Sequence, residues 1–128
     1  MLLPRLCLFA ALTSLGVTGA DKPLSPVEAR KKVGASVTVE MTVRAAKDRL
    51  EKRGEIYLDS EEDFKDEKNF AVVITKAGAA KLKEAGIDDP AEHFRGKTIR
   101  ATGTVKEVEK VPRIEVDDAK QIQVVESR

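Results

Sequence analysis

The chain has 128 residues, enough for one domain, with 23 basic residues, 22 acidic residues and one cysteine. The near-balance of charge argues against a protein that binds nucleic acid non-specifically through a positive excess. A single cysteine excludes a disulfide within the chain. After the first twenty residues, no apolar run is long enough to cross a bilayer.

The first twenty residues, MLLPRLCLFAALTSLGVTGA, have the order of a secretory signal peptide. Arg5 precedes an apolar run from Leu6 to Leu12, and small residues end the segment at Ala20. Cleavage after Ala20 would remove one arginine and no acid, leaving 22 basic and 22 acidic residues. Cys7 would leave with the leader, so the exported domain would have no thiol chemistry and no thiolate metal site. We expect a periplasmic or extracellular protein.

A polar lead-in, residues 21–34, follows the predicted leader. Ser25 and Pro26 suit the N-cap and first position of a short helical turn, which Gly34 ends. The next segment, ASVTVEMTVRA, has strict two-residue alternation, which predicts a half-buried strand. Its apolar positions are Val37, Val39, Met41 and Val43.

Two further strands are predicted in the first half of the chain. Residues 47–54, KDRLEKRG, are interpreted as a charged connector. EIYLD, residues 55–59, is a second strand with Tyr57 on its polar face, and NFAVVIT, residues 69–75, is a third.

Between these two strands lies an acidic loop. An EF-hand loop beginning at Asp59 would need glycine at its sixth position and glutamate at its twelfth. Those positions hold Phe64 and Phe70, so that calcium motif is absent. A solvated loop that keeps strand edges apart is the favoured interpretation; whether residues 59–67 bind a cation stays open.

The period then changes from strand-like to helical. KAGAAKLKEAG, residues 76–86, has the composition of a helix and ends at a glycine. Asp89 and Pro90 mark a second helix start. Residues 97–108 and 112–116 then read as two strands, and QIQVV, residues 121–125, as a final edge segment.

Three strands, a helical segment and two strands predict an all-β fold with one helical segment. This is the element order of the oligonucleotide/oligosaccharide-binding (OB) fold, a five-stranded Greek-key barrel with a helix between strands three and four. We place that domain at residues 35–126. Gly103 interrupts the fourth strand, where it would bend the chain to close a barrel. A simple edge bulge in an open sheet is the alternative.

Two segments carry a family resemblance. GKTIRATGTV, residues 96–105, and PRIEVDDAKQIQVV, residues 112–125, resemble the closing half of exported bacterial OB-fold domains. The same closing pattern is similar to that appended to some nucleases of the micrococcal-nuclease type. Family members often have an aromatic residue and a glycine in the turn before the proline, but this chain has residues 108–111, VEKV, there. The resemblance implies a fold, and a fold does not imply a function.

In OB folds, ligands lie across strands two and three, between the loops that join strands one to two and four to five. Acidic residues are interleaved with the basic residues of both loops, so a solvated mixed-charge surface is the alternative to a binding groove. Tyr57 is the only aromatic residue expected to face a ligand. The candidate ligand-binding residues are Arg44, Lys47, Arg49, Arg53, Tyr57, Lys106, Lys110 and Arg113.

Three functions remain open. The favoured one is a non-catalytic exported OB-fold binding module whose partner is a protein, a glycan or a single-stranded nucleic acid. The second is a single-stranded nucleic-acid-binding protein in particular, and the third is a metal-dependent nuclease or other hydrolase. His93 is the sole histidine and reads as structural. No catalytic residue, metal ligand or cofactor is assigned, because the sequence lacks the hydrolase and phosphate-loop motifs.

Overall fold

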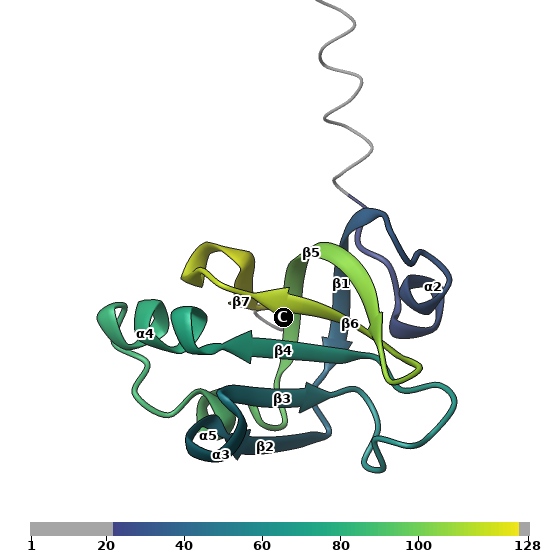
Figure 1. Ribbon diagram of the computed structural model, residues 1–128. Helices are drawn as coiled ribbons and strands as arrows, with labels where there is room; N and C mark the ends of the chain where they lie inside the picture. The colour runs from purple at the N-terminus through teal and green to yellow at the C-terminus, as the bar shows by residue number, and fades with distance from the viewer. Residues whose placement is uncertain (1–21, 126–128) are drawn as a thin grey trace, which may run out of the picture.

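The computed structural model describes residues 22–125, so the predicted signal peptide lies outside the described residues. Short helices and seven strands follow one another along the chain (Figure 1). The strands are β1 (Ser36–Thr42), β2 (Ala45–Arg49), β3 (Glu55–Asp59), β4 (Ala71–Thr75), β5 (Thr98–Val108), β6 (Val111–Val116) and β7 (Ile122–Val124). The helices are α2 (Pro26–Arg30), α3 (Leu50–Arg53), α4 (Lys76–Glu84) and α5 (Pro90–Phe94), with a 3-10 turn, η1 (Ala119–Gln121).

The strands form one sheet in the order β1-β5-β6-β4-β3-β2, and β7 pairs with β5. All pairs are antiparallel except β4 with β6. The two strands at the ends of this order, β1 and β2, are separated in the chain by only Val43 and Arg44. The Val43 N–H donates to the Lys97 carbonyl and the Arg44 N–H to the Asp59 carbonyl, each at 2.9 Å. Within these two residues, the chain therefore changes from pairing with β5 to pairing with β3.

The interpretation of residues 47–54 as a connector was wrong. Ala45–Arg49 form β2, and Leu50–Arg53 form the short helix α3, which ends at Gly54 in the left-handed region. The two-residue alternation of buried positions is interrupted at the bend. After Val43 the next buried residue is Ala46, three positions later, rather than residue 45. A prediction based on two-residue alternation therefore stops at the bend and misses β2.

The core consists of the inward-facing residues of the strands together with side chains from the β3–β4 and β4–β5 connections. Phe70, Leu82 and Phe94 are almost completely buried. Helix α4 begins at the Thr75 cap, whose hydroxyl accepts a hydrogen bond from the Gly78 N–H at 3.1 Å. Other fully buried side chains include Ile56, Leu58, Ile74, Ile99, Ile114, Val39, Val43, Val72, Val73, Val105 and Val116.

Gly103 lies where β5 exchanges partners. Residues 98–104 pair with β1, and Val105 begins the pairing with β6. The strand curves strongly across the molecule (Figure 1). A Cβ atom at position 103 would lie 2.8 Å from Cγ2 of Ile114, closer than van der Waals contact allows. Glycine is therefore required here by the close approach of β6, since its backbone conformation is not left-handed.

The lead-in packs against the sheet. Leu24 bridges to Val39 and exchanges backbone hydrogen bonds with β1. Ser25 and Glu28 form a capping box at the start of α2, as the sequence indicated for the N-cap. Ala29 is fully buried. Within residues 22–125, no helix is both long enough and apolar enough to span a membrane.

Candidate ligand-binding groove

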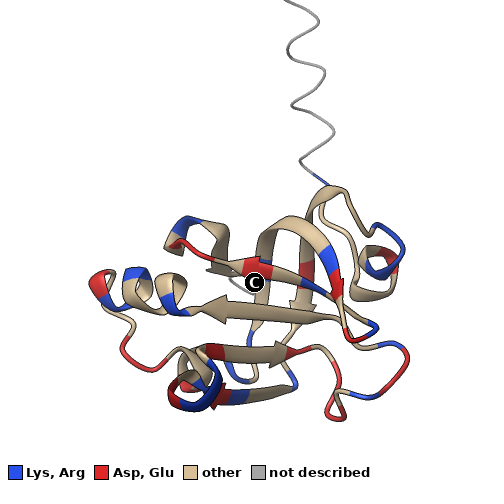
Figure 2. Cartoon of the chain, viewed as in Figure 1, with Lys and Arg blue, Asp and Glu red and all other residues tan. Residues whose placement is uncertain are grey.

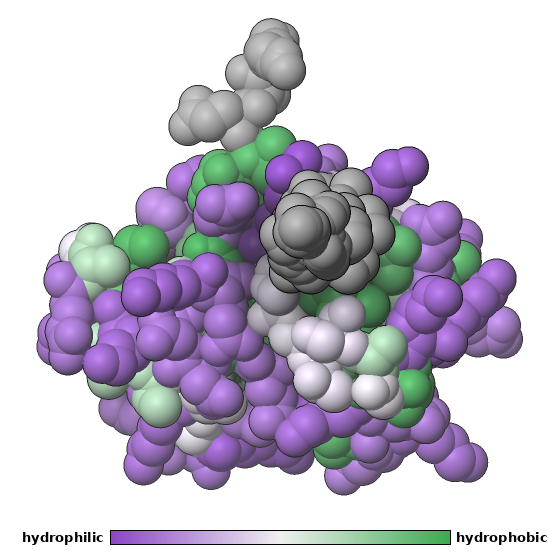
Figure 3. Space-filling view, turned by 90° about the horizontal axis from the view of Figure 1, so that it is seen from above, coloured by the Kyte–Doolittle hydropathy of each residue, from purple (hydrophilic) through white to green (hydrophobic). Residues whose placement is uncertain are grey.

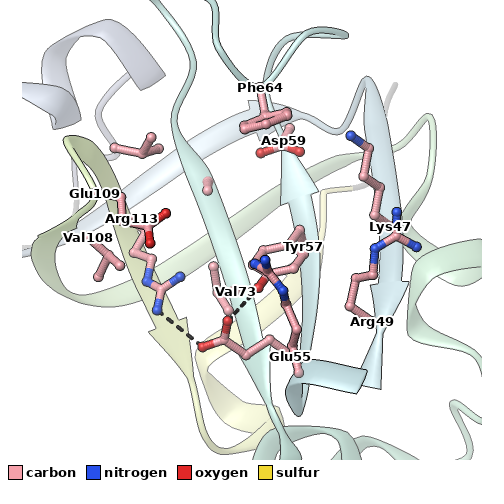
Figure 4. A pocket seen from close by; sticks show the side chains of 13 residues that line it. Lys47, Arg49, Glu55, Tyr57, Asp59, Phe64, Val73, Val108, Glu109 and Arg113 are labelled. Atoms are coloured by element: carbon pink, nitrogen blue, oxygen red, sulfur yellow. Dashed lines mark hydrogen bonds and ion pairs between the residues drawn. The ribbon is translucent and has the colours of Figure 1, made fainter. Parts of the chain in front are cut away.

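A groove of about 580 Å³ runs across the outer face of β2, β3, β4 and β6. Because side chains alternate along a strand, the residues of these strands that line it are all odd-numbered, and the even-numbered ones, except the exposed Asp48, are buried. The turn between β5 and β6 and the loop between β3 and β4 complete the lining (Figure 4). The lining residues are Lys47, Arg49, Arg53, Glu55, Tyr57, Asp59, Phe64, Ala71, Val73, Val108, Glu109, Val111 and Arg113.

The floor of the groove is apolar. Ala71 and Val73 of β4 point outward, yet Val73 is 0% exposed, because longer side chains from β3 and β6 lie over it (Figure 4). Val108 and Val111 add apolar surface where the β5–β6 hairpin reaches the groove. An apolar floor with polar walls is the usual composition of a binding site for a small or extended ligand.

One wall, which we call the paired wall, consists of Glu55, Tyr57 and Arg113. The Tyr57 hydroxyl donates to Oε1 of Glu55 at 2.6 Å, and Nη2 of Arg113 donates to Oε2 of Glu55 at 3.1 Å. Nη2 of Arg113 also donates to Glu115 at 3.0 Å. Burial, followed by the hydrogen bond to Glu55, raises the pKa of Tyr57. This wall is neutralised internally.

Arg113 has one unsatisfied atom. Its side chain is only 12% exposed, and its Nε is the one buried side-chain nitrogen or oxygen in residues 22–125 without a hydrogen-bond partner. A buried donor without an acceptor costs about 1–3 kcal/mol. The paired wall thus retains an unused donor.

A second wall, which we call the basic wall, consists of Lys47, Arg49 and Arg53, on the β2 side of Glu55 and Tyr57. Lys47 and Arg49 project from the outer face of β2, and Arg53 ends α3. None of the three forms an ion pair with any of residues 22–125. The Tyr57 hydroxyl beside Arg53 raises the pKa of that guanidinium. The basic wall therefore presents three cations that have no ion-pair partner among the described residues, although Lys47 lies over the Phe64 ring and Arg53 lies beside Tyr57.

Asp59 and Phe64 close one end of the groove (Figure 4). Asp59 is 3% exposed and accepts a hydrogen bond at Oδ1 from Nδ2 of Asn69, at 3.1 Å. Its second carboxylate oxygen has no hydrogen bond within the described residues. Burial raises the pKa of Asp59, partly opposed by the Asn69 bond and by Lys47. Nζ of Lys47 lies 4.8 Å from the centroid of the Phe64 ring.

The turn that brings Glu109 to the β6 side of the groove has a left-handed backbone. Glu109 has φ 52° and Lys110 has φ 70°, a conformation that favours Asn and Gly in two-residue hairpins. Non-glycine residues in this region cost about 1 kcal/mol or more each. Such strain clusters at functional sites, and here it occurs in a residue that lines the groove.

The structure brings five of the eight predicted ligand-binding residues together in the groove: Lys47, Arg49, Arg53, Tyr57 and Arg113. Arg44 instead lines a separate hollow beside α2 and β1, and Lys110 is exposed in the hairpin turn. Lys106 lies outside the groove and pairs with Glu115 at 3.2 Å. Whether any of the eight binds a ligand stays a prediction.

Several lining residues were not predicted. Glu55, Asp59 and Val73 share the outer face with Tyr57, and the two-residue alternation could have identified them. Phe64 could not be found in this way, because it belongs to a loop. Tyr57 is therefore not the only aromatic side chain at the groove.

Other candidate chemistry is sparse in the part of the chain that the structure describes. No group of three or more His, Cys, Asp or Glu side chains there is arranged to hold a metal ion. His93 packs edge-on against Phe94, with ring centroids 4.7 Å apart, and burial lowers its pKa. This is consistent with the structural role expected for His93.

The surface carries mixed charge. Basic and acidic residues are interspersed over most elements (Figure 2). Seen from above, the molecule is largely hydrophilic, with scattered hydrophobic patches (Figure 3). Within residues 22–125, the exposed large hydrophobic side chains are Val27, Val33 and Phe64. Of these, only Phe64 lies at the groove.

Comparison with known proteins gives a fold but no family. No family model matches the chain, and no curated protein matches it. Among solved structures, it is similar to asparaginyl-tRNA synthetase from Pyrococcus horikoshii, with TM-score 0.54 and 16% identity over 84% of this chain and 24% of that one. It is also similar to aspartyl-tRNA synthetase from Entamoeba histolytica, with TM-score 0.52 and 17% identity over 81% of this chain and 21% of that one.

A third structure matches over nearly its whole length. The OBody AM1L10, solved bound to hen egg-white lysozyme, has TM-score 0.55 and 16% identity over 84% of this chain and 96% of its own. The chain spans only about a quarter of the synthetase structures. At these identities the likeness concerns the fold alone, and it supports a mostly β, OB-like fold.

Proposed function

We propose that this protein is an exported, non-catalytic OB-fold binding module whose ligand lies in the groove. In this proposal β1 and β2 act as one bent strand, so that with β3, β4, β5 and β6 they make a five-stranded barrel. Helices α4 and α5 then correspond to the segment between the third and fourth barrel strands. The order of strand pairing supports this assignment.

Export rests on the leader pattern of residues 1–20. Expressed with its leader in a secreting bacterium, the protein should leave the cytoplasm and begin at Asp21. Intact mass and N-terminal sequencing of each cell fraction would measure this. A full-length product found only in the cytoplasm would contradict export without affecting the binding proposal.

The observation that carries the binding proposal is the contrast between the two walls. On one wall, Glu55 and Arg113 form a largely buried ion pair. Lys47, Arg49 and Arg53 face the same hollow without an ion-pair partner among the described residues. Cations placed beside an apolar floor in a concave site are suited to hold an anionic group of a ligand.

A fragment screen followed by amide NMR tests this proposal without assuming a ligand. Small sugars, nucleotides, peptides and carboxylic acids should shift the resonances of Tyr57, Val73 and Arg113 more than those of α4. The fragments should be recovered chemically unchanged, as expected for a protein that is not an enzyme. Shifts that cluster instead at the hollow beside Arg44 would place the ligand elsewhere, and turnover of a fragment would favour the hydrolase hypothesis.

A single-stranded nucleic acid is the second candidate, favoured by the basic wall together with Tyr57 and Phe64. Stacking of a base on an aromatic side chain is worth about 1–3 kcal/mol, and phosphate contacts make binding strongly salt-dependent. Fluorescence anisotropy of a labelled single-stranded oligonucleotide, at low and then physiological salt, measures both effects. Saturable binding that weakens steeply with salt would support this candidate, and no binding at low salt would remove it.

A further inference from the structure

The groove offers acceptors as well as cations, and this mixture restricts the chemistry of its ligand. We propose that the occupant is an acidic oligosaccharide, a short chain of sugar units that carry carboxylates. The inference rests on the proposed function, because it names the ligand class of the same groove.

The cations suit carboxylates that repeat along a chain. Lys47 and Arg49 are two residues apart on one face of β2, which separates their attachment points by about 6.6–7 Å. Arg53 extends the row beyond the end of the strand. A guanidinium can bind a carboxylate through two parallel hydrogen bonds, which gives geometry as well as energy. An extended ligand with regularly spaced carboxylates would therefore engage the basic wall along its length.

The acceptors suit hydroxyl groups. Asp59 is 3% exposed and lines the groove with one carboxylate oxygen that makes no hydrogen bond within the described residues. Glu109 lies on the β6 side of the groove, near Arg113, in the strained hairpin turn (Figure 4). An ionised carboxylate can only accept hydrogen bonds, so a ligand must bring donors to both groups. Sugar hydroxyls can supply those donors.

The floor and the aromatic rings suit the apolar faces of sugar rings. Val108 and Val111, both half-buried, provide apolar surface where the β5–β6 hairpin reaches the groove, and Tyr57 and Phe64 add aromatic rings to the lining. Tyr57 keeps its hydroxyl on Glu55, so its ring rather than its polar tip is available to pack against a ligand.

A nucleic acid fits the same groove less well. The groove lining includes two carboxylates, Asp59 and Glu109, which would repel a phosphate and a sugar carboxylate alike. A single-stranded DNA backbone, however, has no hydroxyl within the chain to donate a hydrogen bond to them, whereas each sugar unit of an oligosaccharide has. An acidic peptide brings hydrogen-bond donors mainly from its backbone, and its side chains carry no hydroxyl groups to donate to these carboxylates. The acidic oligosaccharide satisfies cations, acceptors and apolar surface together.

The chain has one tyrosine and no tryptophan, so its intrinsic fluorescence reports on Tyr57 alone. The exported protein would be titrated with tetragalacturonate and, as probes matched in length, its fully methyl-esterified form, a single-stranded tetranucleotide and tetraglutamate. Saturable change with tetragalacturonate, at least tenfold tighter than with the ester, is expected, because each charged hydrogen bond contributes about a factor of ten or more.

Two variants separate the ligand classes. Arg49→Gln should weaken tetragalacturonate binding by about tenfold, since a charge-assisted bond is lost. Lys83→Gln, at an exposed position of α4 outside the groove, is the matched control and should change nothing. Asp59→Asn should weaken sugar binding, but it should strengthen oligonucleotide binding because it removes a repulsive charge.

Preferential binding of the tetranucleotide or of tetraglutamate, lost in Arg49→Gln, would overturn the sugar proposal while leaving the groove as the binding site. No change in Tyr57 emission with any probe would also overturn it. The fragment screen would then decide separately whether the groove binds anything. Equal binding of tetragalacturonate by the wild type, Arg49→Gln and Lys83→Gln would show that the groove is not responsible.

Discussion

Both walls of the groove carry arginine side chains, but only that of the paired wall forms ion pairs within the described residues. On the paired wall, Arg113 is buried between two carboxylates and helps hold β3 to β6. On the basic wall, Arg49 and Arg53 have no carboxylate partner in residues 22–125. The comparison teaches that the number of cations at a surface says little about its function. What matters is whether the fold already uses them.

Replacing Arg113 with methionine tests the structural side of this comparison and should have the largest effect. The substitution keeps much of the side-chain volume but leaves Glu55 and Glu115 without their cation. Loss of one partner from a largely buried pair costs about 2–4 kcal/mol. Urea unfolding followed by circular dichroism would measure the free energy of unfolding. Arg49→Met is the matched control, and an equal loss in both variants would contradict the distinction between the walls.

The hairpin turn should give the next largest effect, in the opposite direction. Replacing Glu109 with asparagine and Lys110 with glycine relieves two left-handed conformations and should stabilise the protein by about 1–2 kcal/mol. The double variant should also bind tetragalacturonate more weakly, because Glu109 is lost from the groove. Thermal unfolding and the fluorescence titration measure the two effects. Unchanged stability would mean that the turn is not strained.

Asp59 should make stability depend on pH in a characteristic direction. Its folded-state pKa is raised by burial, so the folded protein binds the proton more tightly than the unfolded chain does. The contribution of this group is fully present below the ordinary aspartate pKa and is lost as the pH rises through the raised value. The free energy of unfolding of the wild type, minus that of Asp59→Asn, should therefore be smaller at neutral pH than at mildly acidic pH. Urea unfolding of both proteins at each pH measures this dependence. It would be absent if the pKa of Asp59 were the same in the folded and unfolded protein.

The basic wall should have the smallest effect on stability. Replacing Lys47, Arg49 and Arg53 together with glutamine should change the free energy of unfolding by less than about 0.5 kcal/mol per site, because no ion pair is lost. The same triple variant should lose tetragalacturonate binding. A large destabilisation, measured by urea unfolding, would show that these cations serve the fold and would remove the contrast with Arg113.

Much of the fold could be predicted from the two-residue alternation of β1, β3, β5 and β6 and from the helical period of α4. Strand β2 could not be predicted in this way, because the alternation of buried positions is interrupted at Val43 and Arg44. Its sequence, AAKDR, has no alternation of large apolar and polar residues. The bend depends on hydrogen bonds to Lys97 and Asp59, which lie far away in the chain.

The site was predictable to the extent that it follows strand alternation. Tyr57, Lys47 and Arg113 lie on outer faces and were found. Lys106 was misplaced because its partner, Glu115, is set by the pairing of β5 with β6 rather than by local sequence. Phe64 was missed because the path of a loop has no period. The distinction between paired and unpaired cations likewise requires the three-dimensional arrangement.

The contact between Gly103 and Ile114 has an evolutionary consequence. A methyl group at position 103 would collide with Cγ2 of Ile114, so the two positions must share one small volume. Among divergent descendants of this chain, a larger residue at 103 should be accompanied by a smaller one at 114. The two sites should therefore covary, although they belong to different strands and lie eleven residues apart in sequence. Such a pair would identify this fold in relatives whose groove residues have all been replaced.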